Sequence, residues 1–153
     1  MEEQSILAGF FALGFAFILI TVIWVIIAYL LTAVALYTMA KNDGADDGVL
    51  AFIPFLNSKI LGDLAKEKLP DFLKEEAGWK VFGIYVACFI LNFIPIISLL
   101  ATGVSIVLSI YLIYAILERY GTNAILFTII HVITCSIFLP IHLFIIRDEP
   151  TKY

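Results

Sequence analysis

The residues of this chain that could do chemistry are the few polar side chains inside its long apolar stretches. His131 lies in the stretch that begins at Asn123, about nine residues and roughly 13 Å along a helix. An imidazole at that depth could relay protons, bind a ligand or hold a cofactor. The alternative is a structural hydrogen bond to a neighbouring helix, which is the more common role of such a histidine.

The second histidine and the acidic residues do not add a cofactor or metal site. His142 follows His131 by about three turns, or some 16 Å along a continuous helix. The two could therefore not bind one haem between them. Asp43, Asp46 and Asp47 could attract a cation, but they lack the ligand spacing and closing glutamate of a calcium loop. The sequence predicts no cofactor and no metal site.

Two more polar residues are candidates for binding. Asn92 precedes Pro95, where its amide could line a cavity or satisfy carbonyl groups that a proline leaves unpaired. Ser105 recurs with Ala101 and Ser109 at every fourth residue, a spacing that lets helix backbones pack closely. Asn92, Ser105 and His131 could alternatively line one path through the protein.

Motifs of known catalytic mechanisms are missing from the sequence. It contains no HExxH, GxSxG or phosphate-binding loop. An enzyme is therefore not the expected class, and a lipid-modifying activity through His131 or Glu118 is the weakest hypothesis. Glu118 and Arg119 are instead expected to form a charge pair at a membrane surface.

The composition indicates the environment in which these residues act. Of the 153 residues, 63% are hydrophobic and 14% are charged, and the mean hydropathy is +1.07, whereas a soluble domain is about 45–50% apolar and about 25% charged. The sequence predicts an integral membrane protein. A net charge of −4 with scattered basic residues argues against a nucleic-acid partner, and Cys88 and Cys135 lie in apolar runs without a disulfide or metal pattern.

Dividing the apolar runs by about 20 residues per crossing predicts an all-α protein with four transmembrane helices. They are expected at residues 6–39, 80–97, 101–119 and 123–146 of a single membrane domain. The first exceeds what one crossing needs, so its end could be covered by another protein. Pro95 and Gly103 mark a tight turn between the second and third helices.

The long loop 41–79 is expected on the cytoplasmic side. It holds most of the lysines, whereas the first five residues hold none, and short lysine-rich loops stay inside the cell. The N-terminus is then outside, and four crossings place the C-terminus outside too. If the run 80–117 is instead one crossing and a re-entrant piece, the C-terminus lies inside. From Pro54 the loop fits a short amphipathic helix, with Ile60 and Leu64 on one side and Lys59 on the other, which is expected to lie flat at the cytoplasmic interface.

A motif in this loop carries a resemblance. The residues Ala51, Ile53, Pro54, Asn57, Leu61, Gly62 and Ala65 form AxIPxxNxxxLGxxA, and the chain ends its last apolar stretch in LPIHLFIIR. Both patterns resemble small, uncharacterised polytopic membrane proteins of Gram-positive bacteria. The resemblance implies a bacterial inner-membrane location and a four-span layout, and it implies no activity. Pro54 and Asn57 of this motif complete the candidate binding residues.

These observations predict a non-enzymatic membrane protein that acts by binding another membrane protein, as an accessory subunit or an immunity-type factor. The expected partners are the lipid bilayer and another membrane protein or further copies of the chain. The alternative is a small transporter or channel assembled from several copies, with Asn92, Ser105 and His131 along its path.

Overall fold

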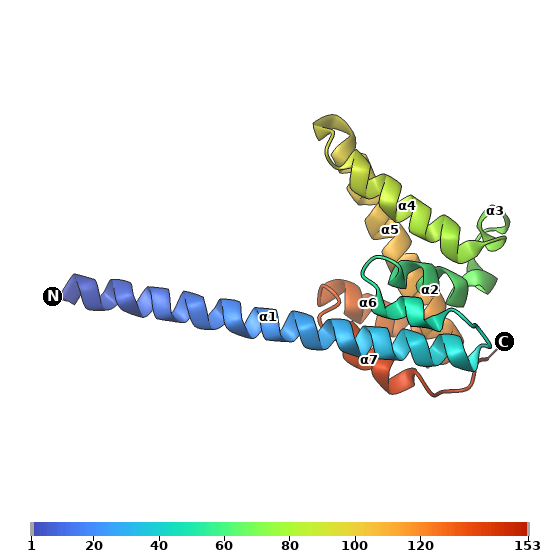
Figure 1. Ribbon diagram of the computed structural model, residues 1–153, viewed down its shortest axis with the longest axis horizontal. Helices are drawn as coiled ribbons and strands as arrows, with labels where there is room; N and C mark the ends of the chain where they lie inside the picture. Colours follow the sequence, from blue (N-terminus) through green and yellow to red (C-terminus); the bar gives the residue numbers. More distant parts are fainter. Residues whose placement is uncertain (1, 153) are drawn as a thin grey trace.

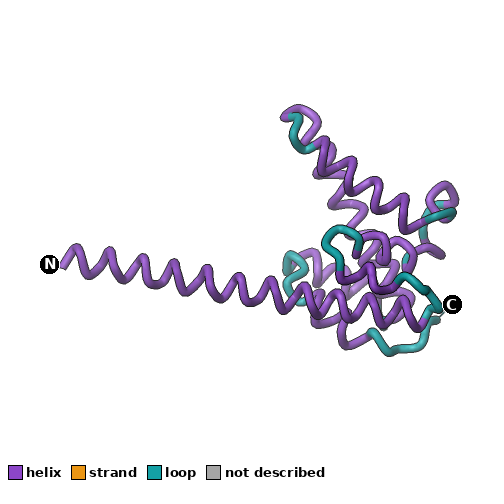
Figure 2. The backbone as a smooth tube through the Cα atoms, viewed as in Figure 1, coloured by secondary structure: helices purple, strands orange, loops and turns teal. Residues whose placement is uncertain are grey.

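The computed structural model describes the backbone of residues 2–152 and the side chains of residue 7 and residues 9–152. Every regular element in this range is a helix (Figure 2), so the expected all-α class is confirmed. The elements are α1 (Glu2–Asn42), η1 (Gly48–Phe52), α2 (Asn57–Leu64), η2 (Lys66–Lys68), α3 (Asp71–Lys74), α4 (Ala77–Leu91), α5 (Pro95–Tyr120), α6 (Ala124–Ile133) and α7 (Leu139–Ile146).

The helix α1 projects far beyond the rest of the molecule (Figure 1). Its large side chains are exposed from Phe10 to Ile23, and its first hydrogen bond to another element is the 2.6 Å bond from the Tyr29 hydroxyl to the carbonyl of Phe52. The C-terminal part buries Leu36 and Met39 in the core. This helix therefore has a free half and a packed half.

Two helical segments are long and apolar enough to cross a membrane: Gly9–Asn42 within α1, and α5. The helices α4 and α6 are apolar but shorter, with 15 and 10 residues. Four crossing helices are predicted from the sequence, and the described part of the chain contains two that meet this length. The second predicted span, 80–97, corresponds to α4, which ends at Leu91. The fourth, 123–146, is divided into α6 and α7.

The second and third predicted spans form a hairpin. The helix α4 ends at Leu91, and α5 begins at Pro95, whose missing N–H and fixed φ suit the first helical position. The turn between them is closed by bonds from the amides of Phe93 and Ile94 to the carbonyls of Ile90 and Leu91, at 3.2 and 3.1 Å. The predicted tight turn lies here, although Gly103 is inside α5.

The last predicted span is two helices instead of one. After Ile133 the amide of Ser136 bonds to the carbonyl of His131 at 2.6 Å, and that of Cys135 bonds to Val132 at 3.2 Å. These two bonds make a Schellman motif. Cys135 and Ser136 have φ of 49° and 58°, so the backbone turns in the left-handed region and α7 runs back along α1.

The two ends of this second hairpin lie close together. The amide of Lys152 donates to the carbonyl of Arg119 at 3.1 Å, and its ammonium group donates to the carbonyl of Gly121. The chain therefore leaves α5, runs out through α6, and returns through α7 to its starting point. This hairpin therefore begins and ends at the same end of the molecule.

The helix α2 is part of the buried core. Its Ile60 and Leu64 are buried, as expected for its apolar side, but Lys59 on the other side is buried too. The side of α2 that carries Gly62 packs against α4, where Gly62 lies against Gly78. A Cβ atom on Gly62 would lie 2.9 Å from the Cα of Gly78, so the close approach requires both glycines.

The buried ammonium group of Lys59 is held by two carboxylates. It donates to Asp47 and lies 2.7 Å from Oδ2 of Asp63, one turn further along α2. The other oxygen of Asp63 accepts the amide of Gly78 at 2.8 Å. Burial lowers the pKa of Lys59, but the hydrogen bonds to the two carboxylates outweigh it and raise this pKa above its usual value. The ammonium therefore stays charged inside the fold.

A second buried cation joins α5 to two other segments. The guanidinium of Arg119 donates to the carbonyl of Leu64 at 2.9 Å and to Oδ1 of Asp43 at 2.5 Å, and only 8% of the residue is exposed. Glu118, the expected partner of Arg119, instead lies 3.1 Å from the ammonium of Lys68. The acidic turn after α1 is thus a set of ion-pair partners rather than a free loop.

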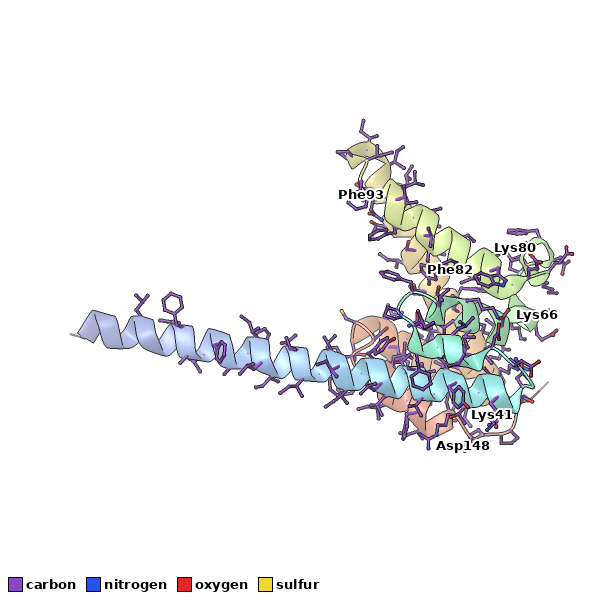
Figure 3. The ribbon with its side chains drawn as sticks, in the orientation of Figure 1. Lys41, Lys66, Lys80, Phe82, Phe93 and Asp148 are labelled. Carbon is purple, nitrogen blue, oxygen red and sulfur yellow. The ribbon has the colours of Figure 1, made fainter. Side chains whose placement is uncertain are left out.

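All charged residues after Glu3 belong to a few segments that lie at one end of the molecule. No charged residue occurs between Glu3 and Lys41, between Lys80 and Glu118, or between Arg119 and Arg147. Figure 3 shows Lys41, Lys66, Lys80 and Asp148 at this end and Phe93 at the far tip of the α4–α5 hairpin. We call the part that holds residues 41–80, 118–121 and 147–152 the polar cap.

Candidate functional site

The two histidines of the chain meet across the α6–α7 hairpin. The Nε2 atom of His131 lies 2.8 Å from Nδ1 of His142, within hydrogen-bonding distance. The ring of His142 packs on that of Phe127, with 4.5 Å between the ring centroids. The expected separation of about 16 Å is wrong because the helix is broken between the two residues.

The hydrogen bond between the two rings limits the charge of this pair. Each neutral imidazole carries one donor and one acceptor, so a bond between the two rings requires at least one of them to be neutral. His131 is 2% exposed, and its Nδ1 has no hydrogen-bond partner within residues 2–152. One polar atom of the pair is therefore left over at a buried position, which is unusual in a folded protein.

His131 lines a cavity together with two of the other predicted residues. This cavity, of about 480 Å³, lies between α5, the end of α4 and the α6–α7 turn, and we call it the polar cavity. Its polar lining residues are Asn92, Thr102, Ser105, Ser109, His131 and Ser136. The structure thus brings together Asn92 at the end of α4, Ser105 in α5 and His131 in α6.

A second cavity adjoins the first. It has a volume of about 620 Å³ and shares Asn92 and Ser105 with the polar cavity. Its other walls come from the loop before α2 and from α4, and they are mainly apolar: Pro54, Phe55, Phe82, Val86 and Phe89. We call it the apolar cavity. Phe55 stands in this wall with a φ of 68°, which turns the chain between η1 and α2.

Two of the remaining candidates, Asn57 and Glu118, line neither cavity. Asn57 is the first residue of α2, is partly buried, and lines neither cavity. Glu118 forms an ion pair with Lys68 in the polar cap. It belongs to α5, whereas His131 belongs to α6. Of the two motif residues, only Pro54 reaches a cavity.

Several residues of this site are not predicted from the sequence. Thr102 donates to the side-chain oxygen of Asn92 at 2.9 Å, and the hydroxyls of Tyr85 and Ser109 lie 2.7 Å apart. The spacing of Ser105 and Ser109 is visible in the sequence, but it is equally typical of helix packing. The role of His142 has no sequence signal, because it depends on the turn at Cys135.

The two cavities are lined by uncharged groups. Within the described residues no group of three histidine, cysteine or acidic side chains could hold a metal ion. None of the residues that line the two cavities is an aspartate, glutamate, lysine or arginine. What the site offers is an apolar space beside a set of neutral hydroxyl, amide and imidazole groups.

Comparison with protein families, with curated proteins and with solved structures finds no match to this chain.

Proposed function

We propose that this protein is inserted in a membrane through α1, α4 and α5, with α6 and α7 as a re-entrant hairpin. The uncharged stretches between the polar segments support this, since charged side chains are costly in lipid. The helix α5 has 26 residues and is roughly 39 Å long, against a hydrocarbon core of about 30 Å. The loop and C-terminal motifs favour the inner membrane of a Gram-positive bacterium.

In this arrangement the polar cap lies in the cytoplasm. The re-entrant hairpin ends at Lys152, which bonds to Arg119 of α5. Arg147 and Lys152 then lie on the side of the loop lysines, as the preference of lysine and arginine for the cytoplasm requires. It replaces the four-span scheme, which places these two residues outside. The N-terminus and the tip at Phe93 are then external.

Cysteine labelling of intact cells tests this topology. In a chain with Cys88 and Cys135 replaced by serine, a membrane-impermeant maleimide should label Phe93→Cys. It should leave Glu149→Cys and Lys66→Cys unlabelled until the cells are opened. Labelling of Glu149→Cys from outside, with Lys66→Cys protected, would restore the four-span scheme.

The function that we propose is to bind another membrane protein through the free half of α1, as an accessory subunit or an immunity-type factor. The observation that carries it is the length of this helix and its exposure. Its 41 residues span roughly 61 Å, about twice the hydrocarbon core. The large side chains from Phe10 to Ile23 are exposed, so they are available to a partner helix.

Site-specific photo-crosslinking in the native host tests this role. A benzophenone amino acid at Phe10 or Phe17 should give one discrete protein adduct, because a docked helix presents a fixed neighbour. The matched control is Phe93, an exposed aromatic at the tip of the other hairpin, which should not give that adduct. Adducts with lipid alone at Phe10 and Phe17, at native expression level, would contradict the proposal.

A small transporter or channel made of several copies is the second candidate. It is favoured by one observation, the convergence of Asn92, Ser105 and His131 on the polar cavity. Liposomes that contain the purified chain should then pass small neutral solutes, and His131→Ala should change the flux several-fold while Ser98→Ala, outside both cavities, should not. Absence of flux, or flux that His131→Ala leaves unchanged, removes this candidate.

A further inference from the structure

The two adjoining cavities carry an inference about a ligand that is independent of the protein-binding role of α1. It starts from the hydroxyl groups of the polar cavity. Ser105 donates its proton to the carbonyl of Ala101 at 3.0 Å, Ser109 donates to the carbonyl of Ser105 at 2.8 Å, and Thr102 donates to Asn92 at 2.9 Å. Each of these three protons is already used.

A hydroxyl group has one proton but two acceptor lone pairs. With their protons used inside the protein, the oxygens of Thr102 and Ser105 face the cavity as hydrogen-bond acceptors. The oxygen of Ser109 already receives a proton from Tyr85, since its own proton is used. The wall along α5 therefore selects a ligand that brings a hydrogen-bond donor.

Two further groups can complete the bond pattern of such a ligand. Asn92 uses one of its two amide protons on the carbonyl of Cys88 at 2.8 Å, which leaves the other for a ligand oxygen. The ring of His131, nine-tenths buried and with an unpartnered Nδ1, also lines this cavity. A group that both donates and accepts fits this set, and a hydroxyl is the simplest such group.

The charge and shape of the cavities restrict the ligand further. The lining residues carry no formal charge, so a phosphate, carboxylate or ammonium headgroup would be buried without a partner at a large cost. The apolar cavity shares Asn92 and Ser105 with the polar cavity, and its Phe82 and Phe89 offer a surface for a hydrocarbon chain. The ligand is then an uncharged amphiphile.

We propose that the two adjoining cavities together bind a neutral long-chain alcohol of the membrane. Its hydroxyl group lies in the polar cavity, donating to the Ser105 or Thr102 oxygen and accepting from Asn92, and its chain lies in the apolar cavity. Both diacylglycerols and polyprenols have this chemistry, a free hydroxyl on a long apolar body. They differ in the chain, which is straight in one and branched in the other.

Photolabelling of the full-length protein in nanodiscs tests the proposal. The probe is a long-chain alcohol with a diazirine in its chain, and its control is the methyl ether of the same molecule, which accepts but does not donate. The alcohol should label the peptides around Phe82 and Phe89. The ether should label them about tenfold less, because it has no proton to donate to the oxygens of the cavity wall. Equal labelling by the two probes would overturn the proposal.

Variants distinguish labelling by a probe bound in the cavity from labelling by a probe in the surrounding lipid. Ser105→Phe adds a bulky ring to the wall that the two cavities share and should abolish the labelling, whereas Ser98→Phe, on the same helix but lining neither cavity, should keep it. Because Ser105→Phe could unfold the hairpin, Ser105→Ala is measured beside it, and it should weaken labelling several-fold through the lost acceptor. Labelling that survives both Ser105 variants, or that spreads evenly over α1, reports bulk lipid only and overturns the proposal.

Competition distinguishes the two sources of the alcohol. Untagged dioleoylglycerol that displaces the probe identifies an acyl ligand, and a C55 polyprenol that displaces it identifies a prenyl ligand. Displacement by neither means that the cavity does not bind membrane alcohols. Labelling that persists while Phe10 and Phe17 give no protein adduct would contradict only the role of α1, so the two proposals fail separately.

Discussion

Replacing Arg119 with methionine lowers the free energy of unfolding by about 3–5 kcal/mol, the cost of removing one partner of a buried ion pair. The guanidinium is almost fully buried and holds both the carbonyl of Leu64 and the carboxylate of Asp43. Methionine keeps much of the side-chain volume but leaves both oxygens without this donor. The acidic turn after α1 and the end of α2 then lose their common attachment to α5.

Equilibrium unfolding in mixed detergent micelles, followed by circular dichroism, measures this effect. The matched control is Lys74→Met, which removes an ion pair with Asp71 that is exposed to solvent and should have little effect, because solvent screens such a pair. The double variant Arg119→Met, Asp43→Leu should recover part of the loss, because it leaves no unpaired carboxylate. Equal stabilities of Arg119→Met and Lys74→Met would show that the Arg119 contacts are not important.

Replacing Gly78 with alanine separates α2 from α4. The added Cβ would lie 2.5 Å from the carbonyl oxygen of Lys59 and 2.6 Å from Oδ1 of Asp63. The first is a backbone atom inside α2, so it cannot move without moving the helix. We expect a loss of about 3 kcal/mol, at the upper end of the usual cost of overpacking, and a weaker hold on the Lys59 ammonium.

The same unfolding measurement checks this prediction, and the chain offers a close control. Gly83 lies on the same helix, and a Cβ there would meet nothing within 4 Å. Gly83→Ala should therefore leave stability unchanged or raise it by about 0.5–1 kcal/mol through helix propensity. A Gly78→Ala variant as stable as Gly83→Ala would contradict the close approach of α2 and α4.

The sequence predicts the parts of the fold that depend on local chemistry. The hairpin turn before Pro95 follows from the missing amide proton of proline, and the end of α1 follows from the turn residues around Gly44, whose φ is 80°. The all-helical class follows from long uncharged apolar runs. The grouping of Asn92, Ser105 and His131 on one path was predicted as an alternative, and these three residues do line one cavity.

The break in the last apolar stretch could not be predicted from the local sequence. It is made at Thr134, Cys135 and Ser136, with neither the glycine nor the proline that usually marks such a turn. The left-handed conformation at Cys135 costs roughly 1–2 kcal/mol, and the packing of α7 on α1 and the bond between the two histidines offset that cost. Both contacts join residues that only the folded chain brings together.

The sequence by itself determined that the chain is helical, where its apolar stretches begin and end, and that its charges lie in a few short segments. Composition and residue spacing are local properties, and they decide which segments prefer an apolar environment. The tertiary structure alone decided that Arg119 pairs with Asp43, that His131 meets His142, and that two adjoining cavities share Asn92 and Ser105 in their walls. These contacts depend on the directions in which helices leave their turns, and a turn of one left-handed residue changes that direction without changing the hydrophobic pattern.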